Sequence, residues 1–309
     1  MAAPSPTWST LDRGDTTVAV CRWEGADPPR SVVVIAHGAS EHAGRYARLA
    51  SALTGDGHVV YGIDHRGHGR TAADHGTPGV ARPGGWEAMV TDLEALVDDA
   101  AAAHPDLPVI LLGHSMGSFL AQRVMQRRGD RLAAVVLSGT SGGLEGADDL
   151  APLLAAVEAE QGAEAPSELF AGMFAGFNEA FAGTVDEPTG FEWLSRDADE
   201  VATYVADPWC GGPLSNGFVT DMTTGTRALW QPEAEAGIPA GLPILLIAGD
   251  HDPVGDNGVS VRALAERYEA AGKGPVTLRL YPDARHEVVN ETNRDEVTAD
   301  LRSWLDGVR

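Results

Sequence analysis

The sequence predicts an α/β fold, in which a mostly parallel central sheet is flanked by helices and carries an inserted helical cap. Short runs rich in β-branched residues alternate with longer amphipathic stretches over most of the 309 residues, which is typical of parallel strands joined by crossover helices. Residues 32–35 and 244–247 are continuously apolar, which indicates strands buried on both faces. The alternation stops after Ser138, so we expect one core interrupted by an insertion.

The predicted elements follow in chain order. Segments 8–11 and 17–23 alternate polar and apolar residues, and we expect them to add antiparallel strands at one edge of the sheet. Buried strands are expected at residues 31–36, 58–63, 108–113, 132–138, 243–248 and 276–281. Helices are expected at residues 45–53, 86–103, 116–126, 259–271 and 295–305.

The insertion lies between about residues 142 and 230, where no buried strand is evident. Helical patches at residues 149–160 and 167–181 are separated by turns that contain Gly and Pro. The sequence therefore predicts a core made of residues 1–141 and 233–309, with residues 142–232 forming the cap.

The chain is strongly acidic, with 45 Asp and Glu against 22 Lys and Arg and a net charge of −23. Such a surface repels a phosphate backbone, and no basic cluster offsets it locally, so nucleic-acid binding is disfavoured. Residues 143–235 alone hold 18 Asp and Glu against Arg196 and Arg227. We interpret this acidity as a solvated surface, with exclusion of anionic substrates as the alternative.

No segment resembles a secretion signal or a membrane span. The first residues lack a basic stretch followed by an apolar one, and no apolar run approaches about eighteen residues. We therefore expect a cytoplasmic protein without stable insertion into a membrane. Cys21 and Cys210 are then expected to be reduced thiols rather than a disulfide.

The strongest chemical motif is G-x-S-x-G, at Gly113-His114-Ser115-Met116-Gly117. A predicted strand runs into it and a helix of small and apolar residues leaves it, which is the context expected of a nucleophilic serine. The two glycines leave room for a sharp, strained turn, because a Cβ at either position would crowd it. We predict Ser115 as the nucleophile, and the alternative is a glycine-rich turn in which the serine is incidental.

Attack by a neutral hydroxyl requires a base, and the base requires a carboxylate that orients it. His286 follows the last predicted strand, which is the position expected of the base in the chain order Ser, Asp, His. The loop after the strand at 243–248 offers Asp250 and Asp252. We favour Asp252, which lies further out on the loop, although Asp before Pro is also a common turn residue.

Two N–H groups are expected to stabilise the oxyanion. The Met116 N–H, which follows the nucleophile, suits the first role, and the helix that begins there adds its dipole. The strand at 31–36 opens into a loop in which Gly38 permits a tight turn and the Ala39 N–H can point into the site. A phosphate-binding loop is the alternative, but the chain lacks the glycine motifs of such loops here.

A stripe of large apolar residues in the predicted cap suits an acyl chain. Its members recur at spacings of three and four, on one helix face. They are Leu169, Phe170, Met173, Phe174, Phe177 and Phe181. The stripe either lines an acyl tunnel, with Phe174 and Phe177 contacting substrate, or simply packs against the core.

These segments resemble the monoacylglycerol lipase and lysophospholipase branch of the α/β-hydrolases, also called the serine aminopeptidase S33 or hydrolase-4 group. The likeness extends over nearly the whole core and into the cap. The matching segments are residues 37–46, 64–70, 113–117, 190–197, 249–253 and 284–287.

The resemblance implies an α/β-hydrolase fold with Ser115, Asp252 and His286 as the catalytic triad and Ala39 and Met116 as the oxyanion hole. It also implies that Glu41 and Arg45 bind a glycerol head group; a local i, i+4 ion pair is the alternative for these two. His114, inside the elbow, is also expected among the substrate-binding residues. The chain departs from the family at Val289, where the mammalian enzyme has a polar head-group residue.

We therefore expect a serine carboxylic ester hydrolase that cleaves fatty-acyl monoesters through an acyl-enzyme on Ser115, with no metal or organic cofactor. Activity is expected to rise around pH 6 to 7 if the pKa of His286 is near its ordinary value. The alternatives are a carboxylesterase for other monoesters, including aromatic ones, a thioesterase, a peptidase, or a non-catalytic binding protein. Epoxide hydrolases and dehalogenases are disfavoured because they have Asp where this chain has Ser115.

Overall fold

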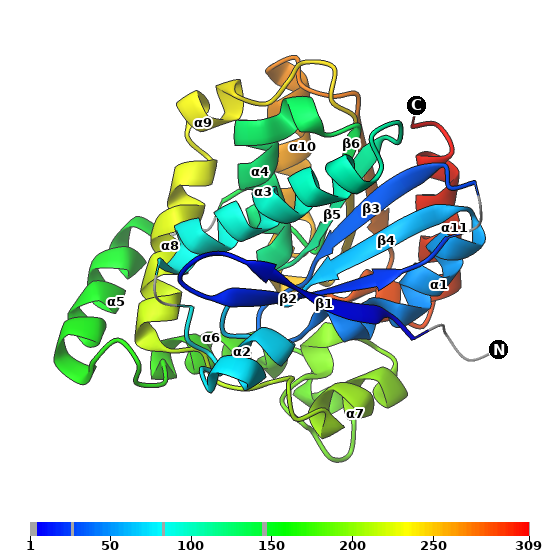
Figure 1. Ribbon diagram of the computed structural model, residues 1–309. Coiled ribbons are helices and arrows are strands. Elements are labelled where there is room, and N and C mark those ends of the chain that lie inside the picture. The colour runs from blue at the N-terminus through cyan, green and yellow to red at the C-terminus, as the bar shows by residue number, and fades with distance from the viewer. Residues whose placement is uncertain (1–4, 26–27, 82–83, 144–146, 309) are drawn as a thin grey trace.

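The structure is a computed structural model that describes residues 5–25, 28–81, 84–143 and 147–308 (Figure 1). Within these residues, one eight-stranded sheet runs in the order β1-β2-β4-β3-β5-β6-β7-β8. β1 and β2 are antiparallel to each other, β2 is antiparallel to β4, and the remaining neighbours are parallel. The strands are β1 (Thr7–Asp12), β2 (Thr17–Trp23), β3 (Ser31–Ala36), β4 (His58–Ile63), β5 (Val109–His114), β6 (Ala134–Ser138), β7 (Ile244–Gly249) and β8 (Val276–Tyr281).

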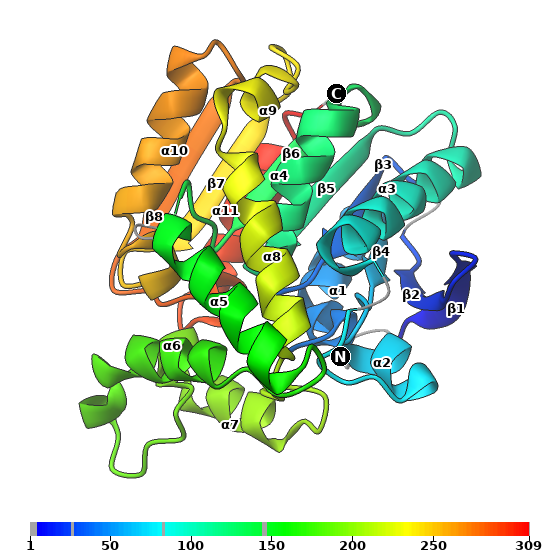
Figure 2. The same ribbon diagram turned by 90° about the vertical axis from the view of Figure 1, so that its left-hand side faces the viewer.

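Helices cover both faces of the sheet, as the apolar strands predict. α1 (Ala47–Gly55) and α11 (Arg294–Leu305) lie on one face, while α3 (Gly85–Ala103), α4 (Met116–Arg128) and α10 (Val259–Ala270) lie on the other (Figure 2). Alternate side chains of β3 enter the two resulting cores, with Val32 and Val34 on the α3 side and Val33 and Ile35 on the α1 side. The predicted fold class and the antiparallel N-terminal edge are confirmed.

The chain between β6 and β7, residues 139–243, is called the β6–β7 insertion below. Its helices are α5 (Ala147–Gln161), α6 (Glu168–Glu179), α7 (Ala198–Ala206), α8 (Asn216–Leu229) and α9 (Pro232–Ala236). α8 contacts α3, α4 and α5, so part of the insertion packs along the side of the core. α6 and α7 instead lie beyond one end of the sheet (Figure 2).

The structure contains helices that the sequence analysis did not predict. α8 was missed because Gly and Thr, which are poor helix formers, fill much of it. It forms because Ser215 caps its first turn by accepting from the Phe218 N–H, and because Phe218 and Val219 are buried in the core. α2 (Gly69–His75), hidden in a glycine-rich motif, ends at Gly76, which adopts a left-handed φ of 66°.

Two further findings concern the expectations about cysteine and membranes. Cys21 and Cys210 are both free, as predicted. Among the described residues, no helix is both long enough and apolar enough to cross a bilayer.

Candidate active site

Ser115 lies at the turn between β5 and α4, at the carboxyl end of the central strands. Its φ of 52° and ψ of −123° form a strained conformation for a residue with a side chain. The turn is so tight that only glycine fits at positions 113 and 117. A Cβ on Gly113 would lie 2.2 Å from the Gly117 carbonyl oxygen, and a Cβ on Gly117 would lie 2.1 Å from the Ala36 carbonyl oxygen. The local geometry expected of a G-x-S-x-G turn is therefore present.

His286 and Asp252 form a buried pair beside this turn. His286 Nδ1 lies 2.9 Å from Asp252 Oδ1, and neither side chain is appreciably exposed. Asp252 follows β7, and its Oδ1 also accepts from the Val254 N–H, which fixes the carboxylate. Asp250 instead contacts the exposed ring of His251, so it is Asp252 that the fold brings to His286.

The pKa of His286 depends on two opposing effects. Burial favours the neutral ring and by itself lowers this pKa, while the charge and the hydrogen bond of Asp252 favour the imidazolium. The effect of Asp252 outweighs the effect of burial, so the pKa of His286 is raised above its ordinary value of 6.5. This differs in direction from the unshifted value assumed in the sequence analysis.

A small cavity of about 20 Å³ adjoins Ser115 and His286. It is called the polar cavity below because Glu41, His114 and Glu287 line it together with apolar side chains. His114 lines it, with its ring centroid 4.7 Å from that of His286. Burial, followed by the neighbouring charge of His286, lowers the pKa of His114 to about 4, so this ring is neutral at ordinary pH.

Trp193, from the insertion, also packs against His286, with ring centroids 4.9 Å apart. The Trp193 backbone carbonyl accepts a hydrogen bond from the backbone N–H of His286. The sequence analysis did not single out Trp193, although it lies in the cap segment 190–197.

Glu41 and Arg45 belong to a buried ion-pair cluster. Arg45 Nη1 lies 2.8 Å from Glu41 Oε2, which is the predicted i, i+4 pair, and Arg45 also donates two hydrogen bonds of 2.6 and 2.7 Å to Glu287. Burial opposes ionisation of both carboxyl groups, but Arg45 overcomes it and the pKa of each is lowered. Glu41 and Glu287 line the polar cavity. Glu287 was missed in the sequence, where its position directly after His286 was the available signal.

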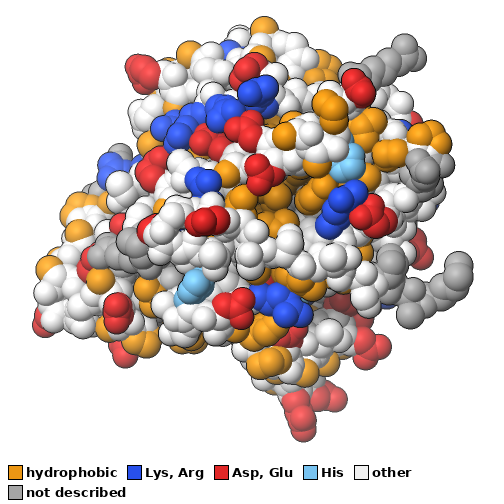
Figure 3. All heavy atoms as spheres, viewed as in Figure 1, with side chains coloured by type: hydrophobic (Ala, Val, Ile, Leu, Met, Phe, Trp, Pro, Cys, Tyr) orange, Lys and Arg blue, Asp and Glu red, His pale blue; other side chains and the backbone are white. Residues whose placement is uncertain are grey.

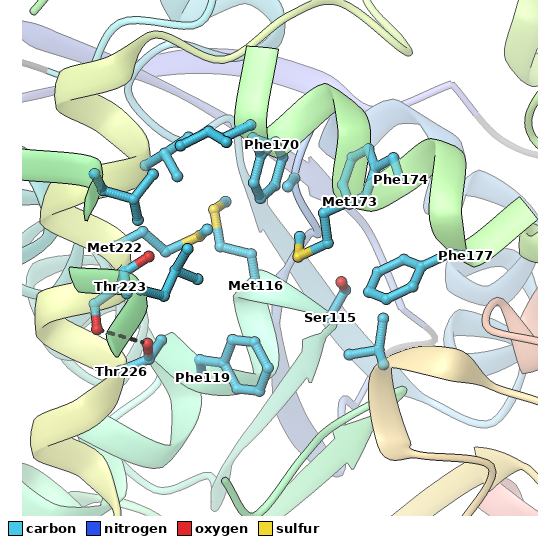
Figure 4. A pocket seen from close by; sticks show the side chains of 16 residues that line it. Ser115, Met116, Phe119, Phe170, Met173, Phe174, Phe177, Met222, Thr223 and Thr226 are labelled. Atoms are coloured by element: carbon cyan, nitrogen blue, oxygen red, sulfur yellow. Dashed lines mark hydrogen bonds between the residues drawn. The ribbon is translucent and has the colours of Figure 1, made fainter. Parts of the chain in front are cut away.

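A larger apolar cavity of about 240 Å³ also adjoins Ser115 (Figure 4) and shares Ala39, Ser115 and Phe174 with the small one. Ala39 and Met116, the expected oxyanion donors, line it together with Ser115. Its walls come from α5, α6 and α8. The lining residues from these helices are Leu150, Leu154, Leu169, Phe170, Met173, Phe174, Phe177, Val219, Met222, Thr223 and Thr226.

The predicted apolar stripe of α6 thus faces the cavity rather than only the core. Phe174 and Phe177 both line it, as expected of substrate-contacting residues. Phe181 does not line it: the helix ends at Glu179, and Phe181 packs with Trp193 and under the guanidinium of Arg285. The stripe is therefore one residue shorter than the sequence predicts.

One group of potential metal ligands occurs among the described residues, formed by His42, Asp207 and Cys210. Hydrogen bonds already engage both ring nitrogens of His42 and both carboxylate oxygens of Asp207. His42 Nδ1 accepts from the Gly44 N–H, so Nε2 carries the ring proton and donates it to Asp207 over 2.9 Å. The nitrogen that faces the group therefore offers no lone pair to an ion.

Comparisons with known proteins agree with this geometry. The family model described as serine aminopeptidase, S33, matches residues 27–293. A monoacylglycerol lipase of Mycolicibacterium smegmatis is 33% identical over 294 residues, which are 92% of this chain and 90% of the relative. Phospholipase YtpA of Bacillus subtilis is 39% identical over 285 residues, which are 91% of this chain and 97% of the relative.

A solved structure of similar sequence has nearly the same fold. The thermostable carboxyl esterase from Bacillus coagulans, crystallised in complex with glycerol, is 30% identical and superposes with a TM-score of 0.90. The match covers 99% of each chain, so the β6–β7 insertion is included in the likeness.

Proposed function

The chain belongs to the serine aminopeptidase S33 family, and on this premise we propose that it hydrolyses monoacylglycerols, with Ser115 as nucleophile, His286 as general base and Asp252 as the residue that orients the base. The protein is a serine ester hydrolase of the monoacylglycerol lipase type.

The proposed reaction has two steps. His286 takes the proton of the Ser115 hydroxyl as the oxygen attacks the ester carbonyl, and the N–H groups of Ala39 and Met116 stabilise the oxyanion. The tetrahedral intermediate collapses, and the alcohol leaves with the proton from His286. Water, deprotonated by His286, then attacks the acyl-enzyme, so that the fatty acid is released and Ser115 regains its proton.

The observation that carries the proposal is the position of Ser115 between two unlike cavities. The apolar cavity of about 240 Å³ suits an acyl chain, and the polar cavity of about 20 Å³, roughly the space of one water molecule, offers polar partners to the hydroxyl groups of an alcohol. An ester carbonyl at Ser115 would have its acyl chain in the first and its alcohol directed toward the second. We propose that residues 142–232 act as a cap, since α5, α6 and α8 supply most of the apolar wall.

The charges around the polar cavity favour a neutral polyol over a phosphorylated head group. Glu41 and Glu287 are held ionised, and Arg45 supplies one positive charge against these two negative ones. A phosphate placed here would meet two carboxylates in a site too buried for water to screen them. A lysophospholipid is therefore the weaker candidate, although one relative is named a phospholipase.

A substrate panel tests the proposal. Wild type, Ser115→Ala and the control Ser303→Ala, a serine on the exposed side of α11, are assayed on 1-monoacylglycerols of increasing chain length, a lysophosphatidylcholine, and p-nitrophenyl esters from acetate to palmitate. We expect the highest kcat/KM on medium or long-chain monoacylglycerols and loss of turnover only in Ser115→Ala.

Other outcomes would change the proposal in distinct ways. Activity confined to short or aromatic esters would keep Ser115 as nucleophile but remove monoacylglycerol as the substrate. Preference for lysophosphatidylcholine would contradict the argument from the two carboxylates. Turnover that survives in Ser115→Ala would overturn the assignment of the nucleophile.

A further inference from the structure

The loop at residues 37–42, called the oxyanion loop here because it carries Ala39, has three consecutive peptide groups that are each fixed by a buried side chain. The Gly38 N–H donates to Glu41 Oε1 over 2.6 Å. The Gly38 carbonyl accepts from His37 Nδ1 over 2.7 Å, and the Ser40 N–H donates to His68 Nε2 over 3.0 Å. These three hydrogen bonds set the direction of each peptide.

The two histidines are suited to this role because each is neutral with a defined tautomer. His37 Nδ1 is the donor, and its Nε2 accepts from the His65 N–H over 3.1 Å. His68 has the same tautomer, with Nδ1 donating to the Arg66 carbonyl over 3.0 Å and Nε2 accepting from the Ser40 N–H. Burial lowers both pKa values, that of His68 to about 4, so neither ring takes up a second proton at ordinary pH. Segment 64–70, a motif to which the sequence assigned no role, thus supports the loop from the core side.

Fixing the Gly38 carbonyl also fixes the direction of the Ala39 N–H. The two groups belong to one planar trans peptide and point in opposite directions. Among the described residues, the Ala39 N–H makes no hydrogen bond to a protein acceptor. The loop therefore holds this donor ready for an oxygen of the substrate.

Ser40 connects the loop to the β6–β7 insertion. Its carbonyl accepts from the Tyr204 hydroxyl over 2.8 Å and from the Gly211 N–H over 2.9 Å, and its hydroxyl donates to the Gly212 carbonyl over 2.9 Å. Ser40 has a φ of 55°, in the left-handed region that a residue with a side chain adopts only when its surroundings enforce it. The enforcing contacts come from α7 and the loop after it on one side, and from His68 on the other.

We propose that Ser40 is a positioning residue that makes the oxyanion hole depend on the docked position of the β6–β7 insertion. The inference rests on the proposed function, in which the Ala39 N–H stabilises the oxyanion. With the insertion docked, Ser40 is held at its N–H, carbonyl and hydroxyl, and the peptide that joins it to Ala39 cannot turn. When α7 and its loop move away, Ser40 keeps only its hydrogen bond to His68 and is free to leave the left-handed region. The chain then shifts at Ala39, whose N–H, although still anchored through the Gly38 carbonyl to His37, loses its position relative to Ser115. The insertion thereby permits turnover only when it is closed.

Two variants and one control test this coupling. Tyr204→Phe removes the hydroxyl that holds the Ser40 carbonyl, but keeps the ring that packs on Arg45. Ser40→Ala removes the hydrogen bond to Gly212. Tyr61→Phe, which removes a phenol hydroxyl bonded to His104 far from the site, is the matched control. The readouts are kcat and KM for p-nitrophenyl butyrate and the inhibition constant of butaneboronic acid, which forms a tetrahedral adduct with a nucleophilic serine.

We expect Tyr204→Phe and Ser40→Ala each to lower kcat by about 10-fold, less than the roughly 10²- to 10³-fold loss on removing an oxyanion donor itself. KM should stay within about twofold, and affinity for the boronic acid should fall by the same factor as kcat, because only the tetrahedral species uses the hole. Tyr61→Phe should match the wild type in all three readouts.

The opposite pattern overturns the proposal. A raised KM with unchanged kcat and boronic acid affinity in both variants would mean that these groups only shape the alcohol side of the site. If Tyr204→Phe fails to fold by thermal unfolding, Ser40→Ala decides the question alone. Failure of the proposed function is detected separately, because Ser115→Ala would then retain activity, and that result overturns both proposals.

Discussion

His286 is the residue whose surroundings bear most directly on activity. It must be neutral to take the proton of Ser115, and its pKa is raised because the charge and hydrogen bond of Asp252 outweigh burial. Activity should therefore increase as pH rises through a midpoint above 6.5, the ordinary value. The measurement is kcat/KM for a p-nitrophenyl ester between pH 5 and 9, a range that extends on both sides of 6.5.

Removing the Asp252 carboxylate should reveal its two effects on His286, which are to orient the ring and to raise its pKa. Asp252→Asn is expected to lower kcat by about 10⁴-fold, since the amide favours the wrong tautomer. It should also move the midpoint of the acidic limb to lower pH, because the charge that raised the pKa of His286 is gone. Asp250→Asn, an exposed neighbour on the same loop, is the control and should change neither quantity. An unshifted midpoint in Asp252→Asn would contradict the assignment.

Arg45 is the residue on which the buried carboxylates depend. Arg45→Leu leaves Glu41 and Glu287 unpaired in the interior, which should lower the free energy of unfolding by about 3–5 kcal/mol at pH 7. Because the folded pKa values of both carboxyl groups are depressed, their contribution in the wild type is complete above the unfolded value of 4.5 and is lost as pH falls below it.

Urea unfolding at two pH values checks this prediction. The difference between wild type and Arg45→Leu should be large at pH 7 and smaller near pH 4. Arg30→Leu, which breaks an exposed pair with Asp306, should cost at most about 1 kcal/mol at either pH. A difference that does not depend on pH would indicate lost packing rather than lost charge pairing.

At the scale of elements, α5, α6 and α8 define the size of the apolar cavity. Leu154 of α5 lines this cavity, whereas its neighbour Leu153 is 49% exposed. Leu154→Trp should reduce the volume of the cavity and lower kcat/KM for palmitoyl esters by about 10-fold or more, while butyryl esters, which need less of this volume, are affected little. Leu153→Trp adds the same side chain to the surface and should leave the chain-length profile unchanged. Equal losses on all chain lengths would mean that the helix, not the cavity, was disturbed.

The insertion also gives the whole molecule its surface character. Of the large hydrophobic side chains that are exposed in the described residues, all but Val259 lie on the insertion: Leu153, Leu169, Val185, Val205 and Trp209. Acidic side chains project from the same end of the molecule in Figure 3, below the sheet. Exposed apolar side chains among negative charges suit a neutral lipid interface better than an anionic one.

Vesicle assays test this at the scale of the molecule. A monoacylglycerol should be hydrolysed more slowly in phosphatidylglycerol vesicles than in phosphatidylcholine vesicles, and high salt should reduce the difference by screening the repulsion. Hydrolysis of p-nitrophenyl butyrate dissolved in water should be the same with either lipid present. Equal or faster rates on the anionic vesicles would show that the net charge of −23 does not control access to the interface.

The sequence by itself determined the features that depend on local pattern. The central parallel strands could be found from their runs of apolar residues, because burial on both faces leaves few polar positions, whereas the edge strand β8 is only partly buried and keeps Thr277 and Arg279. The turn at Ser115 could be found because only glycine fits at positions 113 and 117, where a Cβ would collide with the backbone. The order of Ser115, Asp252 and His286 along the chain was sufficient to nominate them as candidates.

Only the tertiary structure decided which distant groups meet. Asp250 and Asp252 look alike in the sequence, and the fold brings only Asp252 to His286, 34 positions away. Arg45 and Glu287 are 242 positions apart, so their pairing has no local signal. α8 was invisible because burial against the core, not intrinsic propensity, makes it helical. The contacts of Ser40 with the insertion, more than 160 positions away, likewise arise only when the chain is folded.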